Sequence, residues 1–326
     1  MDFAMHDHDR APLTDRLPLA RTRVDRDDAR RRDEGLLESL LDYEGTRVLL
    51  QHRDNALLGP ANDRGERILD LRTPAHLPAH SEPLYLGRTL DERRNPGGRI
   101  DPVGTPVVAV QLDDFEANEL EPDQTRWAQL TEVALSLDAL DAGLFTEALA
   151  LRNFHRAHRY SPLTGEPLES AEGGWVLRGR ESGKPVFPRT DTAVIVAVID
   201  GNDRILLGAN VNWRPRRFSL LAGFVEPGES FEQAAAREVF EEGGARIVEP
   251  RYLASQPWPF PASLMVGMTA RLAPEQDPDS VVPDGEEIAE VRWFTREEIA
   301  ASPELLPGPT SIARVIIEDW YGGPIG

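Results

Sequence analysis

The stretch from Gly223 to Gly244, GFVEPGESFEQAAAREVFEEGG, constrains this chain more than any other. It carries six glutamates and one arginine on and around a predicted helix. Ser230 with Gln233 forms a capping box, which predicts the start of the helix, and Gly243-Gly244 predicts its end. The sequence therefore predicts an acidic helix between a glycine turn and a glycine stop.

Three of these glutamates lie on one face of the helix. Glu238, Glu241 and Glu242 are spaced i, i+3 and i+4, and residues so spaced are surface neighbours. Like charges there repel by roughly a few tenths of a kcal/mol per pair, so we expect a counter-charge. Carboxylates without His or Cys suit Mg²⁺ or Mn²⁺ rather than zinc, and Mg²⁺ is usually shared with substrate phosphates. The alternative is a solvated acidic face without chemistry.

The fixed positions of this stretch resemble the signature of the Nudix hydrolases. They match at every position up to Gly244, and only Ala245 departs, where that family usually has a larger aliphatic residue. The resemblance implies an α/β Nudix fold, a mixed sheet between helices. It also implies structural roles within the signature for Gly223, Glu229, Arg237 and Gly244, with Arg237 pairing with Glu229.

The same resemblance implies the metal site. Glu238 and Glu242, with the carbonyl of Ala222, would hold one to three divalent ions, and Glu241 would help to bind metal or its water. A downstream carboxylate is also expected, and Glu287 best matches its spacing to a following tryptophan; Glu286 and Glu290 are the competitors.

A second motif narrows the family. Ser255-Gln-Pro-Trp-Pro-Phe-Pro-Ala-Ser263 resembles the SQPWPFPxS motif of the NADH pyrophosphatase branch, the NudC type. Prolines alternating with Trp258 and Phe260 predict a rigid extended wall, suited to a flat base. The alternative is a proline-rich surface loop with two core aromatics.

Resemblance to this branch also implies the substrate contacts. The nicotinamide would stack on Phe224 and on Phe187 from a second subunit, which requires a homodimer; the alternative for Phe187 is a core residue. The remaining expected contacts are Gln256, Pro257, Trp258, Pro259, Phe260, Pro261, Ala262, Ser263 and Ala313.

Length and composition predict a two-domain globular protein. The chain has 326 residues, 40% of them hydrophobic. It shows no apolar run of membrane-spanning length and no signal peptide, and it has no cysteine, so we expect a cytoplasmic protein without membrane contact. The predicted segments are a disordered charged tail (1–36), a strand-rich N-terminal domain (37–150), a zinc-ribbon-like module (151–189) and the Nudix domain (190–326).

The net charge of −20 argues against broad binding to nucleic acid. We therefore expect no DNA partner, and any contact with RNA must be local.

The zinc-ribbon-like module departs from the branch. Related enzymes usually carry two Cys-x-x-Cys pairs there, whereas the matching positions in this chain are Ser161, Thr164, Gly179 and Ser182. None of these can supply a thiolate, imidazole or carboxylate ligand, so we expect no zinc.

The order of strands agrees with a Nudix domain near the C-terminus. Ala193–Ile199 is an apolar run typical of a buried strand, followed by a turn and a second strand from Arg204. All seven histidines lie at or before residue 158, which leaves carboxylates and metal to do the chemistry of this domain.

Resemblance to the NADH pyrophosphatase branch implies hydrolysis of the diphosphate of NADH or NAD⁺ to nicotinamide mononucleotide and AMP. It also implies removal of a 5′ NAD cap from RNA by the same reaction. Two alternatives stay open, a Nudix hydrolase of ADP-ribose or diadenosine polyphosphates, and a non-catalytic NAD-binding regulator. The sequence does not choose between free dinucleotide and capped RNA, nor between Mg²⁺ and Mn²⁺.

Overall fold

The computed structural model describes residues 11–60, 67–78, 82–212 and 217–326. Contacts divide the chain into two compact units. The C-terminal unit consists of Met1–Ala20, Asp191–Pro257 and Ser263–Gly326, and the N-terminal unit of Arg21–Thr190 with Trp258–Ala262.

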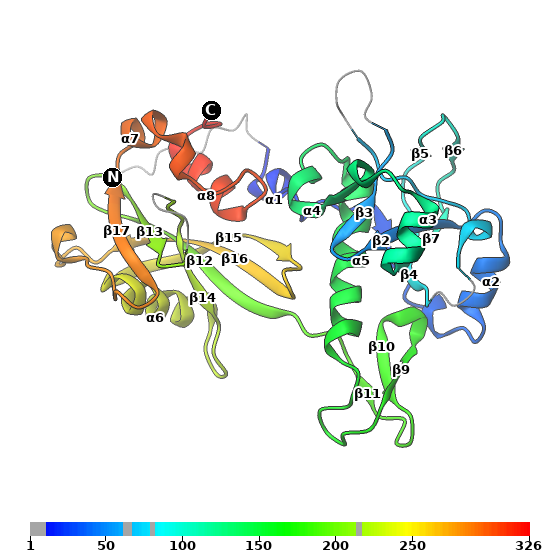
Figure 1. The fold of residues 1–326 in the computed structure, drawn as a ribbon. Helices are drawn as coiled ribbons and strands as arrows, with labels where there is room; N and C mark the ends of the chain where they lie inside the picture. The colour runs from blue at the N-terminus through cyan, green and yellow to red at the C-terminus, as the bar shows by residue number, and fades with distance from the viewer. Residues whose placement is uncertain (1–10, 61–66, 79–81, 213–216) are drawn as a thin grey trace. The chain divides into compact units, whose positions relative to one another are not determined.

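The C-terminal unit is built on a mixed sheet with strand order β15-β16-β12-β13-β17, and β14 pairs with β12 (Figure 1). Strand β12 runs parallel to β16 and antiparallel to β13. The elements of this unit are α1 (Leu13–Arg16), β12 (Asp191–Ile199), β13 (Ile205–Asn210), β14 (Leu221–Phe224), α6 (Phe231–Gly243), β15 (Ile247–Trp258), β16 (Ser263–Leu272), η5 (Pro278–Ser280), β17 (Ile288–Phe294), α7 (Arg296–Ala301), η6 (Pro303–Leu305) and α8 (Ile312–Tyr321).

Helices cover both faces of this sheet (Figure 1). Because side chains alternate along a strand, Val194 and Val196 of β12 pack in one core with residues of α6. Ile195 and Ala197 pack in the opposite core with residues of α8. The predicted mixed sheet between helices is confirmed, and the apolar run 193–199 is its buried central strand.

The prediction of a disordered tail is wrong for residues 11–36. Leu17 is fully buried in the core beside α8, and Leu19 is 2% exposed. Arg16 forms an ion pair with Asp319 at 2.6 Å. Val24 begins a short strand that pairs with β4 of the N-terminal unit. The few leucines in this charged segment pack against apolar residues far away in the sequence, and the mean composition of the segment does not reveal this. Residues 1–10 of the predicted tail lie outside the described residues.

The N-terminal unit contains a six-stranded sheet of order β1-β4-β7-β2-β3-β8. Strand β2 runs parallel to β7 and antiparallel to β3, and β3 pairs antiparallel with β8. Its elements up to the long helix are β1 (Val24–Asp25), η1 (Arg30–Arg32), α2 (Leu36–Asp42), β2 (Arg47–His52), β3 (Asn55–Leu57), η2 (Pro74–His76), β4 (Leu84–Thr89), β5 (Arg93–Arg94), β6 (Ile100–Asp101), β7 (Pro106–Leu112), α3 (Asp114–Leu120), η3 (Gln124–Arg126), β8 (Trp127–Gln129), α4 (Leu130–Val133) and α5 (Ala139–Ala157).

The two sheets share a strand order. The run β4-β7-β2-β3-β8 has the same parallel pair, hairpin and antiparallel final strand as β15-β16-β12-β13-β17. In the C-terminal unit the acidic helix α6 lies between the hairpin and β15. In the corresponding stretch 58–83, the described residues contain only the short η2. As far as its residues are described, the N-terminal unit thus repeats the sheet without a counterpart of the acidic helix.

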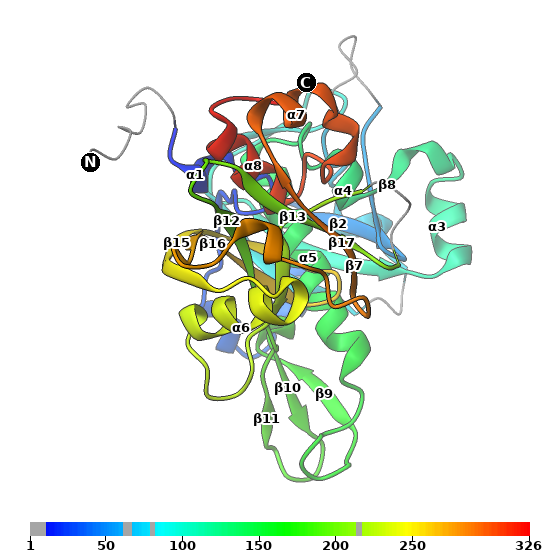
Figure 2. The ribbon, with the colours of Figure 1, turned by 90° about the vertical axis from the view of Figure 1, so that its left-hand side faces the viewer.

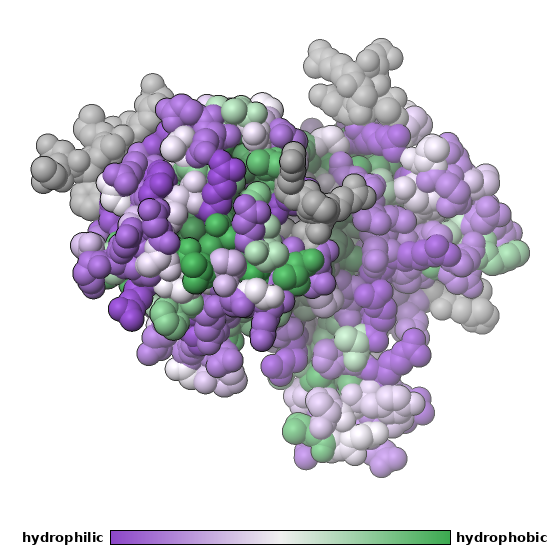
Figure 3. Space-filling view, turned by 60° about the vertical axis from the view of Figure 1, so that its left-hand side comes forward, coloured by the Kyte–Doolittle hydropathy of each residue, from purple (hydrophilic) through white to green (hydrophobic). Residues whose placement is uncertain are grey.

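Trp127 lies in β8, and helical structure starts at Leu130. Beyond α5, a separate three-stranded sheet is formed by β9 (Leu168–Ala171), β10 (Val176–Gly179) and β11 (Pro185–Val186), with η4 (Glu172–Gly174) between the first two (Figure 2). No helix in the described part of the chain is long and apolar enough to cross a membrane. The face of the molecule in Figure 3 is mainly hydrophilic.

Candidate active site

The acidic helix α6 is capped as predicted. The Ser230 hydroxyl accepts from the amide of Gln233, and the Gln233 side chain accepts from the amide of Ser230. At the other end Gly244 adopts a left-handed conformation with φ of 65°, which glycine tolerates without strain. These caps fix the first and last turns, and with them the direction of the glutamates between.

Arg237 contacts several residues on and around this helix. It donates to both carboxylate oxygens of Glu229, at 2.7 and 2.8 Å, and to the carbonyl of Phe224 at 2.9 Å. It also contacts Glu238 at 2.8 Å and Glu241 at 2.9 Å. The expected pairing with Glu229 is present, and it holds the pKa of Glu229 down to about 2. Arg237 therefore supplies a protein counter-charge to two of the three glutamates.

Glu238 lies directly against the backbone of Gly223. A Cβ atom at position 223 would stand 2.0 Å from the Glu238 carboxyl carbon, far inside contact distance. Gly223 belongs to β14, which is held in register by pairing with Val194 of β12. Position 223 therefore requires glycine because there is no room for a side chain. The absence of a side chain lets the Glu238 carboxylate lie against the backbone of β14.

Glu242 is the buried member of the set. Its side chain is 4% exposed, and Glu242 Oε2 accepts from the amide of Ala222 at 3.1 Å. Burial raises its pKa to about 8, and the charges of Glu287 and Glu238 add to the rise. Glu241, by contrast, has a side chain 57% exposed. The three glutamates thus lie on one helix surface but differ in their exposure to solvent.

Glu287 is the downstream carboxylate that the structure brings to this cluster. Its charge raises the pKa of both Glu238 and Glu242, which favours it over Glu286 and Glu290. Asp284, which the sequence analysis missed, accepts from the amides of residues 286, 287 and 288 and shapes the turn that carries Glu287. An Asp-Gly dipeptide before the glutamates was the available signal.

These residues fit a hard divalent cation. The donors are carboxylates beside a strand end, and Glu242 is buried near like charges with a single backbone donor. Within the described residues, no three Asp, Glu or His side chains are grouped closely enough to hold a metal by themselves. Backbone, water and substrate oxygens would have to complete the coordination, which is usual for Mg²⁺.

The middle of the aromatic motif, Trp258–Ala262, belongs to the N-terminal unit. Trp258 and Phe260 form an edge-to-face pair with centroids 5.0 Å apart. The buried side chain of Asn153, in α5, donates to the carbonyls of Pro259 and Pro261, both at 2.9 Å. Asn153 was not identified from the sequence, because nothing local distinguishes it from other polar residues of a helix.

Two of the expected substrate contacts are buried within the C-terminal unit. Gln256 is 0% exposed; its side chain accepts from the amide of Leu19 at 3.3 Å and donates to the carbonyl of Thr310 at 3.1 Å. Ala313 is 1% exposed and belongs to the core beside the sheet. Both side chains therefore help to hold the fold, and their role as substrate contacts stays a prediction.

The remaining expected contacts differ in exposure. Phe187 is 62% exposed and Phe224 is 59% exposed, so neither ring is a core residue within its own unit. Pro259 is buried and Pro261 exposed, whereas the intermediate positions are Pro257, Trp258, Phe260, Ala262 and Ser263.

A carboxylate stands at the centre of the ribbon-like module. Glu166 accepts from the hydroxyls of Thr164 and Ser182 and from the amides of Glu181 and Ser182, and these bonds lower its pKa to about 2. A Cβ at Gly179 would stand 2.4 Å from Glu166 Oε1. Three of the four positions that match cysteines in related ribbons therefore surround one carboxylate.

Two family models match the chain. The NUDIX domain matches residues 188–316, and the NADH pyrophosphatase-like rudimentary NUDIX domain matches residues 40–153. The second match agrees with the sheet that is repeated without its acidic helix.

Named relatives are similar over part of their length. NAD-capped RNA hydrolase NudC from Mycobacterium bovis (strain BCG / Pasteur 1173P2) is 48% identical over 196 residues, 56% of this chain; the chain spans 62% of that protein's length. NAD-capped RNA hydrolase NudC from Salmonella agona (strain SL483) is 39% identical over 182 residues, 55% of this chain and 67% of that protein. A crystal structure of a NUDIX hydrolase from Nitrosomonas europaea is 24% identical, with a TM-score of 0.40, over 51% of this chain and 94% of that chain.

The acidic helix, the aromatic motif and both family matches lead to one assignment: the chain belongs to the Nudix hydrolase superfamily, in its NADH pyrophosphatase (NudC-type) branch.

Proposed function

We propose that this protein hydrolyses the diphosphate of NADH or NAD⁺ to nicotinamide mononucleotide and AMP, and removes 5′ NAD caps from RNA by the same reaction. The observation that carries the proposal is that the carboxylates of Glu238 and Glu242 both lie against the backbone of β14, at Gly223 and Ala222. The names of the relatives support the NAD-related substrate, as does the aromatic motif.

The chemistry is a hydrolysis without redox change. A water attacks one phosphorus atom, the bond to the bridging oxygen breaks, and that oxygen leaves on the other phosphate. A bound Mg²⁺ or Mn²⁺ would neutralise the phosphate oxygens and lower the pKa of the attacking water. We propose that Glu238, Glu242, Glu287 and the Ala222 carbonyl hold the cation, that Glu241 assists, and that Arg237 positions the helix.

Specificity distinguishes this proposal from its competitor within the family. We expect kcat/KM to be higher for NADH than for ADP-ribose, because ADP-ribose has no second base to stack on the aromatic motif. Parallel assays of these substrates and of NAD-capped RNA test this, and a preference for ADP-ribose would contradict it. A non-catalytic regulator is disfavoured because all the signature glutamates are present.

We further propose a homodimer in which Phe187 stacks on the substrate of the partner subunit. The exposure of Phe187, which is 62% exposed, supports this proposal. Base stacking is worth roughly 1 to 3 kcal/mol, so Phe187→Ala should lower kcat/KM for NADH about tenfold or more. Mixing Phe187→Ala with Glu242→Gln subunits should restore activity above either parent. A monomer in ultracentrifugation that cleaves NADH at full rate would refute the composite site.

We propose that the ribbon-like module binds no zinc, because Glu166 takes the centre that a metal would occupy. Elemental analysis should find far less than one zinc per chain. Because the folded pKa of Glu166 is depressed to about 2 from its ordinary 4.5, its contribution to stability is present above about pH 4.5 and lost as pH falls towards 2.

Glu166→Gln should therefore lower the melting temperature at pH 7 and remove part of the loss of stability on acidification. Glu169→Gln is the matched control, since Glu169 lies in the same module with a side chain 56% exposed. Stoichiometric zinc, or equal pH dependence in wild type and Glu166→Gln, would overturn this account of the module.

A further inference from the structure

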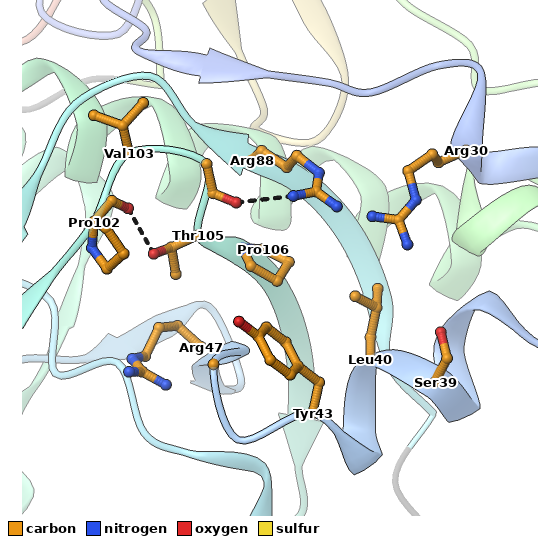
Figure 4. A pocket seen from close by; sticks show the side chains of 12 residues that line it. Arg30, Ser39, Leu40, Tyr43, Arg47, Arg88, Pro102, Val103, Thr105 and Pro106 are labelled. Atoms are coloured by element: carbon orange, nitrogen blue, oxygen red, sulfur yellow. Dashed lines mark hydrogen bonds between the residues drawn. The ribbon is translucent and has the colours of Figure 1, made fainter.

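A cavity in the N-terminal unit is lined by three arginines and a tyrosine. It has a volume of about 520 Å³, and Arg30, Tyr43, Arg47 and Arg88 contribute to its walls (Figure 4). The walls come from η1, the end of α2, the start of β2, and β4, and the loop before β7 completes them. None of these elements carries the glutamates of the proposed active site.

The charge of the lining runs against the charge of the chain. The chain has 56 acidic and 36 basic residues, yet the twelve described residues around the cavity include three arginines and no acid. Each arginine has an acidic partner outside the lining, Asp33, Asp101 or Asp27. Because the lining itself carries only positive charge, it favours an anionic ligand.

Acidic residues behind two of these arginines fix their orientation. Arg88 donates to Asp27 at 2.9 Å and to the carbonyl of Gly104 at 3.0 Å. Arg47 donates through Nε to the buried Asp101 at 2.7 Å, and through Nη1 to the carbonyls of Glu44 at 2.8 Å and Thr46 at 2.7 Å. A guanidinium has five N–H donors, so each keeps donors beyond these bonds. Such fixed forks match phosphate oxygens.

Arg30 is the most available of the three. Its distance to the carboxylate of Asp33 is 3.8 Å, longer than a hydrogen bond, and its side chain is 37% exposed. In Figure 4 the side chains of Arg30, Arg88 and Tyr43 surround one opening, with Leu40 and Pro106 beside them. An anionic ligand can therefore bind Arg30 without breaking a short ion pair.

The remaining lining suits the rest of a nucleotide. Tyr43 is 58% exposed, and an exposed ring beside apolar Leu40 and Pro106 offers a stacking face for a base. A cavity of this size is within the range that holds small organic ligands. We propose that this cavity binds a nucleoside monophosphate unit, its phosphate on Arg30 and Arg88 and its base on Tyr43, either as a free nucleotide or within RNA.

The test measures where nucleotide binds as well as how tightly. AMP is added to the full-length protein in EDTA, and amide hydrogen exchange is followed across the chain. We expect slower exchange over residues 36–47 and 102–107. The effect should be absent with adenosine and weaker with inorganic phosphate. A short 5′-phosphorylated RNA that protects these peptides better than AMP would identify RNA as the source, and the reverse order would identify the free nucleotide.

Two variants and two controls decide the roles of the side chains. Arg30→Ala and Tyr43→Ala should each raise the AMP concentration that gives half-maximal protection, by about tenfold. Arg32→Ala, in the same turn but outside the cavity and 65% exposed, should not change it, nor should Tyr160→Ala, at a ring 65% exposed. No protection at saturating AMP, or protection unchanged in Arg30→Ala, would overturn the proposal. Because the readout is local, it is independent of hydrolytic activity.

Discussion

Glu242→Gln should lower kcat for NADH by roughly 10² or more, about 2.7 kcal/mol of barrier. The substitution keeps the shape of a side chain that is 4% exposed but removes one charge from the proposed metal site. It also relieves repulsion from Glu238 and Glu287, so we do not expect it to unfold the protein.

Glu241→Gln is the comparison for that result. Glu241 is 57% exposed and paired with Arg237 at 2.9 Å, so its substitution should cost less than that of Glu242. Steady-state kinetics over a range of Mn²⁺ and Mg²⁺ concentrations, with circular dichroism as the control for folding, measure both. Full activity of Glu242→Gln would refute the assignment of the metal site.

Gly223→Ala should also reduce kcat, by about 10², without changing any charged group. The added Cβ would stand 2.0 Å from the carboxyl carbon of Glu238, so the carboxylate must move, and displacements of about 1 Å in a catalytic site can cost this much. Gly201→Ala is the matched control, because a Cβ there meets nothing within 4 Å. Equal kcat for Gly223→Ala and wild type would show that the position of Glu238 is not critical.

The sequence predicted what depends on short spacing. The contact of Arg237 with Glu229, which the family resemblance implied, is present. The capping box of α6 and the buried strand β12 depend on residues a few positions apart, and both are present. Residue chemistry and local periodicity are sufficient at that range.

Contacts between distant segments were not predictable in this way. Gln256 is buried through a contact with Leu19, 237 positions away, and Asn153 holds Pro259 across 106 positions. Glu166 was missed for a different reason, since its partners became visible only when the two turns of the module were placed together. Residues 11–36 were misinterpreted because an average over charged residues hides the few leucines that pack.

The most direct test of the proposed function is to identify which bond of NADH is broken, and whether a divalent cation is required. Purified protein is incubated with NADH in Mg²⁺ or Mn²⁺ and, separately, in excess EDTA, and the products are separated by chromatography. We predict equimolar reduced nicotinamide mononucleotide and AMP with a cation, and unreacted NADH in EDTA. Release of nicotinamide, no cleavage with either cation, or equal cleavage in EDTA would contradict metal-dependent hydrolysis of the diphosphate.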